Sequence, residues 1–201
     1  MQQSLGVRRT NQLSMHIQYA IVAFPTLSTR EPIECVRRAF DPQASLLPAH
    51  VTLVFPFTAA VDAKELREHI AATLATAHSF EIAFASPSIE DDGYLFLRVA
   101  TGREHVIALH DRLYSGPLQP YLSTGHAYEP HITIGRLGAP EPLANALAVA
   151  RARLPTSLNG RIDKVALFCI DGSMGRVEST FPIGDPDTLS SDFPRTAPNE
   201  R

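Results

Sequence analysis

One order of predicted elements occurs twice in this 201-residue chain, and that repeat restricts the possible folds more than any other feature. Each copy contains a helix, a strand that starts with His-x-Thr, a second helix and two further strands. The motif strands are HVTLVFPF, beginning at His50, and HITIGRL, beginning at His131. A chance error in one copy would have to recur in the other, so the order of elements is more informative than any single element.

Helices are predicted from caps and from apolar residues at helical spacing. Ser28 followed by Glu31 has the form of a capping box for a helix over 28–40. Asp62 is the predicted N-cap of a helix over 62–77, and two more helices are predicted over 103–115 and 141–154. The apolar positions that define the first two helices are Ile33, Val36, Phe40, Leu66, Ile70 and Leu74.

The remaining patterned segments predict strands over 15–24, 80–84, 94–100, 164–170 and 176–183. Together with the helices they predict an α+β fold. We expect two pseudo-symmetric lobes of antiparallel sheet, with helices on the outer faces and a central cleft. Residues 1–14 and 185–201 lack periodicity and are predicted to be tails, so the folded domain is expected to span 15–184.

Successive side chains in a strand point to opposite faces. His50 and Thr52 therefore share one face of the first motif strand, and Val51, Leu53 and Phe55 are predicted on the other. The apolar face is expected to pack under helices. The polar face must then point toward the space between the lobes.

The second motif strand repeats this arrangement. His131 and Thr133 share a face, and Ile132 and Ile134 oppose them. The sequence thus predicts that two imidazoles and two hydroxyls converge on one site.

Such a set suits phosphoester chemistry without a metal or other cofactor. An imidazole titrates near pH 6.5, so one ring can accept a proton from a nucleophile while the other donates a proton to a leaving oxygen. A threonine hydroxyl can donate a hydrogen bond to a phosphoryl oxygen. A zinc site would need a third ligand beside His50 and His131, and the nearest candidate, Glu129, is expected instead to cap the loop before the second motif.

The segments AHVTLVFPF and EPHITIGR resemble the two signatures of the 2H phosphoesterase superfamily, which includes the bacterial 2′-5′ RNA ligases. The resemblance implies a bilobal α+β fold that cleaves, or reversibly joins, phosphodiesters at 2′,3′-cyclic phosphates or 2′-5′ linked RNA ends. It implies that His50 and His131 are catalytic and that Thr52 and Thr133 bind substrate. The roles of acid and base stay unassigned at this point.

Two further residues are weaker candidates for substrate binding. Family members often carry an arginine after the second motif, and Arg136 has that position. Strict alternation would turn it toward the helices, unless a bulge at Gly135 turns it back; a surface salt bridge is the alternative role. Tyr128, on the loop before the second motif, could stack on a base or pack in the core.

Composition limits the partners. A net charge of −3 and a pI of about 6.2 argue against binding of extended duplex nucleic acid, while RNA termini or a small cyclic nucleotide remain suitable. The longest apolar runs are too short to span a bilayer. Cys35 and Cys169 are expected to be buried and reduced, and we expect a soluble, cytoplasmic monomer. The helical arginines are expected on solvated faces: Arg37, Arg38, Arg151 and Arg153.

Two other functions fit the same motifs. One is a non-catalytic module that binds a phosphorylated ligand or RNA end. The other is a hydrolase of the same superfamily that acts on a small cyclic-phosphate metabolite without any role in RNA.

Overall fold

A computed structural model of the chain describes residues 17–59, 62–125, 127–137, 139–172 and 174–184. The predicted tails, 1–14 and 185–201, lie outside these residues. Four α-helices are described: α1 (Glu31–Phe40), α2 (Ala63–Leu74), α3 (Arg103–Leu113) and α4 (Pro140–Arg153). The strands are β1 (Gln18–Ala23), β2 (Thr26–Leu27), β3 (Val51–Phe57), β4 (Phe80–Phe84), β5 (Ser88–Glu90), β6 (Tyr94–Thr101), β7 (His131–Arg136), β8 (Leu158–Ile162), β9 (Lys164–Asp171) and β10 (Met174–Pro182).

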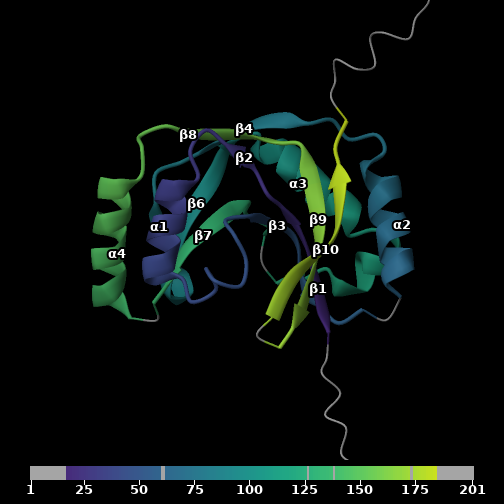
Figure 1. The fold of residues 1–201 in the computed structure, drawn as a ribbon, viewed down its shortest axis with the longest axis horizontal. Helices are drawn as coiled ribbons and strands as arrows, with labels where there is room; N and C mark the ends of the chain where they lie inside the picture. The colour runs from purple at the N-terminus through teal and green to yellow at the C-terminus, as the bar shows by residue number, and fades with distance from the viewer. Residues whose placement is uncertain (1–16, 60–61, 126, 138, 173, 185–201) are drawn as a thin grey trace, which may run out of the picture.

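The strands form two antiparallel sheets, which confirms the predicted α+β class. One sheet has the order β10-β9-β1-β3, and the other has the order β2-β8-β4-β6-β5, with β7 paired to β6. Helices α2 and α3 pack against the sheet that contains β3, and α1 and α4 pack against the strands around β7 (Figure 1). The motif strands β3 and β7 lie between these two helix layers (Figure 1).

The two lobes are not the two sequence repeats. Strands β9 and β10 follow the second motif along the chain, but they join β1 and β3 in one sheet. Strands β4 and β6 follow the first motif, but β6 pairs with β7. Each repeat therefore contributes strands to both sheets, and each motif strand is completed by strands of the other repeat.

The helix starts show one wrong prediction and one confirmed prediction. The N-cap of α1 is Arg30, whose side chain makes no cap hydrogen bond, and the backbone N–H of Ser28 donates instead to the Asn159 carbonyl at 3.0 Å. The predicted capping box is therefore wrong, because Ser28 belongs to the β2–β8 edge. Asp62 is the N-cap of α2, and its carboxylate accepts from the Glu65 N–H at 2.8 Å.

Most other differences lie in short elements. Strand β8 was not predicted, since its sequence LNGRI contains one apolar residue at each end and no alternation. Strand β5 and a 3₁₀-helix, η1 (Asp91–Gly93), lie in the predicted turn, and a second, η2 (Gly116–Tyr121), lies in the predicted loop. Cys169 is buried as expected, Cys35 is only half-buried, and both are free. Among the described residues, no helix is both long and apolar enough to cross a membrane.

Candidate active site

The two motif histidines have the same backbone anchor. His50 immediately precedes β3, and its Nδ1–H donates to the Pro48 carbonyl at 2.8 Å. His131 is the first residue of β7, and its Nδ1–H donates to the Glu129 carbonyl at 2.6 Å. A carbonyl oxygen can only accept, so each neutral ring carries its proton on Nδ1 and leaves the Nε2 lone pair available. Both rings are half-buried.

Both motif strands also contain a bulge at the same place. In β3, Thr52 pairs with Val22 and Val54 pairs with Ile21, so Leu53 is the extra residue. In β7 the residue after Thr133 is extra in the same way, because Thr133 pairs with Phe96 and Gly135 with Leu95. A bulge reverses the alternation of the residues that follow it. The fifth residue after each histidine is consequently exposed: Phe55 in β3 and Arg136 in β7.

The bulges explain the outcome of two predictions, on the orientation of Arg136 and of Phe55. The bulge was predicted at Gly135, but Gly135 pairs with Leu95 and the extra residue is Ile134, one position earlier. Arg136 is exposed, and its guanidinium carbon lies 5.2 Å from the centre of the Tyr94 ring. Arg136 makes no ion pair with a described acidic residue, so the salt-bridge alternative has no support among the described residues. Phe55 was predicted on the buried face and this is wrong: its side chain is 47% exposed.

The two motifs lie close together in space. Strand β3 is an edge strand of one sheet, and β7 pairs with β6 in the other. Strands β3 and β7 contact each other. The proximity is also electrostatic, because a positive charge on His131 lowers the pKa of His50. The structure thus brings together the two histidines that the sequence predicted to converge.

The surroundings of His50 disfavour its charged form. Burial is the main cause that lowers the pKa of His50 to about 4, and the positive charges of Arg37 and His131 act in the same direction. The hydrogen bond to Pro48 and the charge of Asp41 oppose this shift of the pKa. At neutral pH the His50 imidazole is therefore a neutral proton acceptor.

His131 has different neighbours. Its ring stacks on Phe96 with the ring centres 3.6 Å apart and an angle of 14° between the planes. Burial lowers the pKa of His131, while the bond to the Glu129 carbonyl and the carboxylates of Glu90 and Glu129 raise it. Arg98, which pairs across the strands with His131, forms an ion pair with Glu90. This half of the site therefore holds an arginine, Arg98, beside the imidazole, while Arg136 lies further along β7, over the Tyr94 ring.

The threonines of the motifs present unused hydroxyls. Thr52 and Thr133 are both half-buried. Among the described residues, neither hydroxyl has a hydrogen-bond partner within the protein. A half-buried hydroxyl without a partner is well suited to donate to a ligand.

Tyr128 connects the two motifs. Its hydroxyl donates to the backbone carbonyl of Thr52 at 2.6 Å, and its ring stacks on His110 with 3.7 Å between the ring centres. His110 in turn donates from Nδ1 to the Leu53 carbonyl at 2.8 Å, and burial raises the pKa of the Tyr128 phenol. These contacts place Tyr128 under β3, where it supports the motif strand.

Glu129 forms an ion pair with Arg103 at 2.9 Å, which lowers the pKa of its carboxyl. Its side chain thus fixes the approach loop, in line with its predicted capping role. Within the described residues, no group of three or more His, Cys, Asp or Glu side chains is arranged to hold a metal ion.

Sequence reasoning missed Phe55, Phe96 and Arg98. Phe55 had a detectable signal, since it stands five residues after its histidine, as Arg136 does. Phe96 and Arg98 had none, because only the pairing of β6 with β7 brings them beside His131.

Comparison with known proteins gives a consistent result. A family model described as "2′-5′ RNA ligase superfamily" matches residues 25–173. A Bacillus pumilus protein described as "Putative phosphoesterase" is 25% identical over 175 residues, covering 84% of this chain and 99% of the relative. A similarly described Geobacillus protein is 30% identical over 125 residues, covering 60% of this chain and 69% of its own length.

Solved structures share the fold. The crystal structure of E. coli LigT in apo form superposes with a TM-score of 0.55 at 15% identity, covering 84% of this chain and 98% of LigT. E. coli LigT complexed with 3′-AMP superposes with a TM-score of 0.54 at 13% identity, covering 83% of this chain and 97% of LigT.

Proposed function

Because the chain belongs to the 2′-5′ RNA ligase superfamily, we propose that it hydrolyses 2′,3′-cyclic phosphates or 2′-5′ linked RNA ends, with joining as the reverse reaction. The observation that carries this proposal is the duplicated anchor of His50 and His131, which start two neighbouring strands and whose Nε2 atoms have no hydrogen-bond partner among the described residues. Packing gives no reason to repeat such an anchor. Acid–base chemistry needs two imidazoles with their outer nitrogens directed at one phosphorus.

In the proposed hydrolysis, His50 is the base. Its Nε2 takes a proton from water while the water oxygen bonds to phosphorus, and His131 gives its Nε2 proton to the ribose oxygen whose bond to phosphorus breaks. The products are a phosphomonoester and a free ribose hydroxyl. The assignment follows from charge: the pKa of His50 falls to about 4, whereas Glu90 and Glu129 support a proton on His131. In the joining direction the roles exchange.

The threonines complete the proposed site. Hydrogen bonds from Thr52 and Thr133 would hold the two non-bridging phosphoryl oxygens from opposite sides. Because charge increases on these oxygens in the transition state, such bonds strengthen as the reaction proceeds. Arg136, which is exposed at the end of β7, would contact a phosphate of the substrate.

The exposed residues at the two equivalent positions suggest how a nucleotide is oriented. Phe55 offers an aromatic face beside β3, and Arg136 offers a cation beside β7. A base that stacks on Phe55 would leave a phosphate group near Arg136. E. coli LigT, which shares the fold, has been crystallised with 3′-AMP and with ATP, which supports a ligand of nucleotide size.

Hydrolysis of nucleoside 2′,3′-cyclic phosphates in the presence of EDTA tests the proposal. We expect turnover, and a bell-shaped pH dependence of kcat/KM with both limbs below about 6.5, because both histidine pKa values are lowered. A protein that binds these compounds without turning them over would be the non-catalytic module. Turnover that requires a divalent metal would contradict the mechanism.

A hydrolase of small metabolites would not need the nucleobase of a nucleotide for substrate binding. Cyclic phosphates with and without a nucleobase can be compared for this purpose. Equal kcat/KM for both would favour the metabolite function and remove the proposed stacking on Phe55.

A further inference from the structure

Helix α1 has an unusual polar face. Arg30, Glu34, Arg37 and Asp41 recur at helical spacing from the N-cap to the C-cap, so they form one stripe along the helix. Arg37 was predicted to be solvated, and this is wrong: it is 1% exposed. A buried guanidinium requires partners for its donors, and these partners identify what the stripe does.

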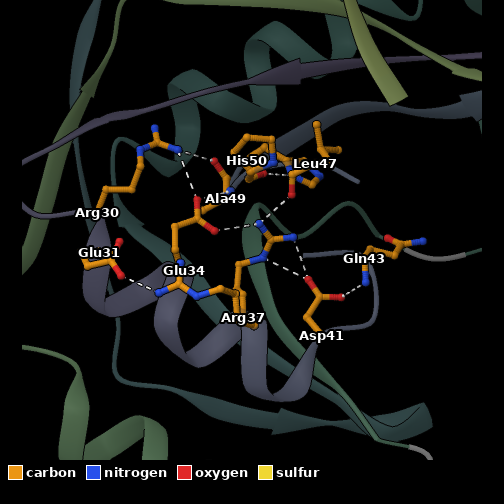
Figure 2. Close-up of polar contacts among 11 residues, drawn as sticks. Arg30, Glu31, Glu34, Arg37, Asp41, Gln43, Leu47, Ala49 and His50 are labelled. Carbon is orange, nitrogen blue, oxygen red and sulfur yellow. Dashed lines mark hydrogen bonds and ion pairs between the residues drawn. The ribbon is translucent and has the colours of Figure 1, made fainter. Parts of the chain in front are cut away.

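Arg37 binds the segment that leads into the first motif. Its Nε and one terminal nitrogen donate to one carboxylate oxygen of Asp41 at 3.0 and 2.8 Å (Figure 2). Its other terminal nitrogen donates to the Leu47 carbonyl at 2.8 Å and reaches Glu34 at 3.3 Å (Figure 2). The guanidinium thus connects the helix to the backbone three residues before His50.

The same stripe holds Ala49. The Glu34 carboxylate accepts from the Ala49 N–H at 2.8 Å, and Arg30 donates to the Ala49 carbonyl at 3.3 Å. Pro48, whose carbonyl accepts from the His50 ring, lies between Leu47 and Ala49, the two residues that the stripe holds. Figure 2 shows this network reaching from α1 to His50. The backbone on both sides of the His50 anchor is therefore fixed by side chains of one helix.

Helix α1 also packs against the strand of the second motif. Although α1 precedes β3 in the chain, it packs on β7. A Cβ on Gly135 would lie 3.3 Å from the Cβ of Phe40, so the helix approaches β7 where only a hydrogen fits easily. The second repeat shows the same crossing, since α3 precedes β7, packs on β3 and contacts the approach loop of β7 through Arg103 and Glu129.

We propose that α1 is a spacer that fixes the relative position of the two motifs, and that Arg37 and Glu34 are positioning residues for His50. One side of the helix packs on β7. Its polar stripe binds the backbone of Leu47 and Ala49, just before His50. The equivalent contact in the second repeat is partly exposed, with Arg103 and Glu129 each at 37%, so His50 has the more rigid support. Only the expected effect on turnover rests on the proposed function; the positioning of His50 does not.

The test compares Arg37→Met and Glu34→Ala with a matched control, Arg38→Met. Arg38 is the adjacent arginine of the same helix, but it is exposed; it forms an ion pair with Glu31 at 2.5 Å and also interacts with Cys35, and neither partner belongs to the polar stripe. Ring ¹⁵N NMR of the free protein reports the tautomer and pKa of His50 and His131 separately, and steady-state kinetics report kcat and KM. Glu34→Ala is the milder change and is informative if Arg37→Met does not fold.

We expect the His50 signals of Arg37→Met and Glu34→Ala to move toward a mixture of tautomers, while those of His131 stay unchanged. Loss of the Arg37 charge should also raise the pKa of His50. Misplacement of the ring should lower kcat by about 10-fold or more, with a smaller effect on KM. Glu34→Gln keeps an oxygen that accepts from Ala49 and should restore both signals and kcat, and Arg38→Met should behave as the wild type.

Unchanged His50 signals and kcat in a folded Arg37→Met or Glu34→Ala would overturn the inference. Equal shifts at His50 and His131 would also overturn it, since they would indicate general loosening. A wild type without phosphodiesterase activity would instead count against the proposed function, and the ring spectra would still decide whether Arg37 and Glu34 position His50.

Discussion

The Tyr128 hydroxyl donates a 2.6 Å hydrogen bond to the backbone carbonyl of Thr52, although the two residues lie 76 positions apart in the chain. The loop that leads into the second motif is thereby attached to the middle of the first. Together with the crossed packing of α1 and α3, this bond explains how two separate motifs keep one geometry.

Replacement Tyr128→Phe removes this bond and leaves the stacking on His110 in place. It leaves the Thr52 carbonyl without its partner, so we expect a loss of about 1–2 kcal/mol in the free energy of unfolding, measured by urea denaturation. Because the two motifs become less firmly connected, kcat should fall more than KM rises. A larger change in KM than in kcat would show that the hydroxyl contacts substrate instead.

Replacement Phe55→Ala tests the orientation of the nucleotide. Base stacking on an aromatic ring contributes about 1–3 kcal/mol, so kcat/KM for a nucleoside 2′,3′-cyclic phosphate should fall by roughly 5- to 150-fold. A cyclic phosphate without a base serves as the control and should be hydrolysed equally by both proteins. An equal loss for both substrates would contradict a stacking role.

Replacement Arg136→Ala tests whether the guanidinium beside β7 binds a phosphate of the substrate. We expect KM for a substrate with an additional phosphate to rise by about 10-fold or more, since a charge-assisted hydrogen bond contributes about 1.5–3 kcal/mol. Arg136→Lys should recover only part of the affinity, because lysine lacks the planar fork. Arg38→Ala, an exposed position on α1, is the control and should match the wild type.

The lowered histidine pKa predicts acid sensitivity. The pKa of His50 is about 4 in the folded protein against about 6.5 in an unfolded chain, so below pH 6.5 the unfolded state binds more protons. Stability is therefore complete above pH 6.5 and is lost as the pH falls toward 4, by up to about 3 kcal/mol from this group.

Urea denaturation of the wild type and of His50→Gln between pH 7 and pH 4 measures this effect. Glutamine does not titrate, so the unfolding free energy of the variant should depend less on pH. Parallel pH dependences would show that burial does not shift the pKa of His50.

The sequence predicted the parts of this fold that local patterns encode. Helix α2, with its Asp62 cap and its buried Leu66, Ile70 and Leu74, follows directly from apolar spacing. The two motif strands and their histidines were likewise visible from alternation.

What the sequence could not predict depends on pairing and on local distortions. Strand alternation placed Phe55 on the buried face because no residue in HVTLVFPF signals the bulge at Leu53. Phe96 reaches His131 only through the pairing of β6 with β7. In the sequence, Arg37 resembles any surface arginine of a helix. It is buried because the segment before β3 folds back onto α1, where the Leu47 carbonyl accepts a hydrogen bond from Arg37.

The most direct test of the account replaces each motif histidine in turn and measures hydrolysis of a nucleoside 2′,3′-cyclic phosphate. General acid and general base catalysis each contribute about 10²–10⁴-fold, so His50→Gln and His131→Gln should each lower kcat by at least about 100-fold. Urea denaturation should show that both variants remain folded. A folded variant at either position that keeps a kcat close to the wild-type value would contradict paired-histidine catalysis.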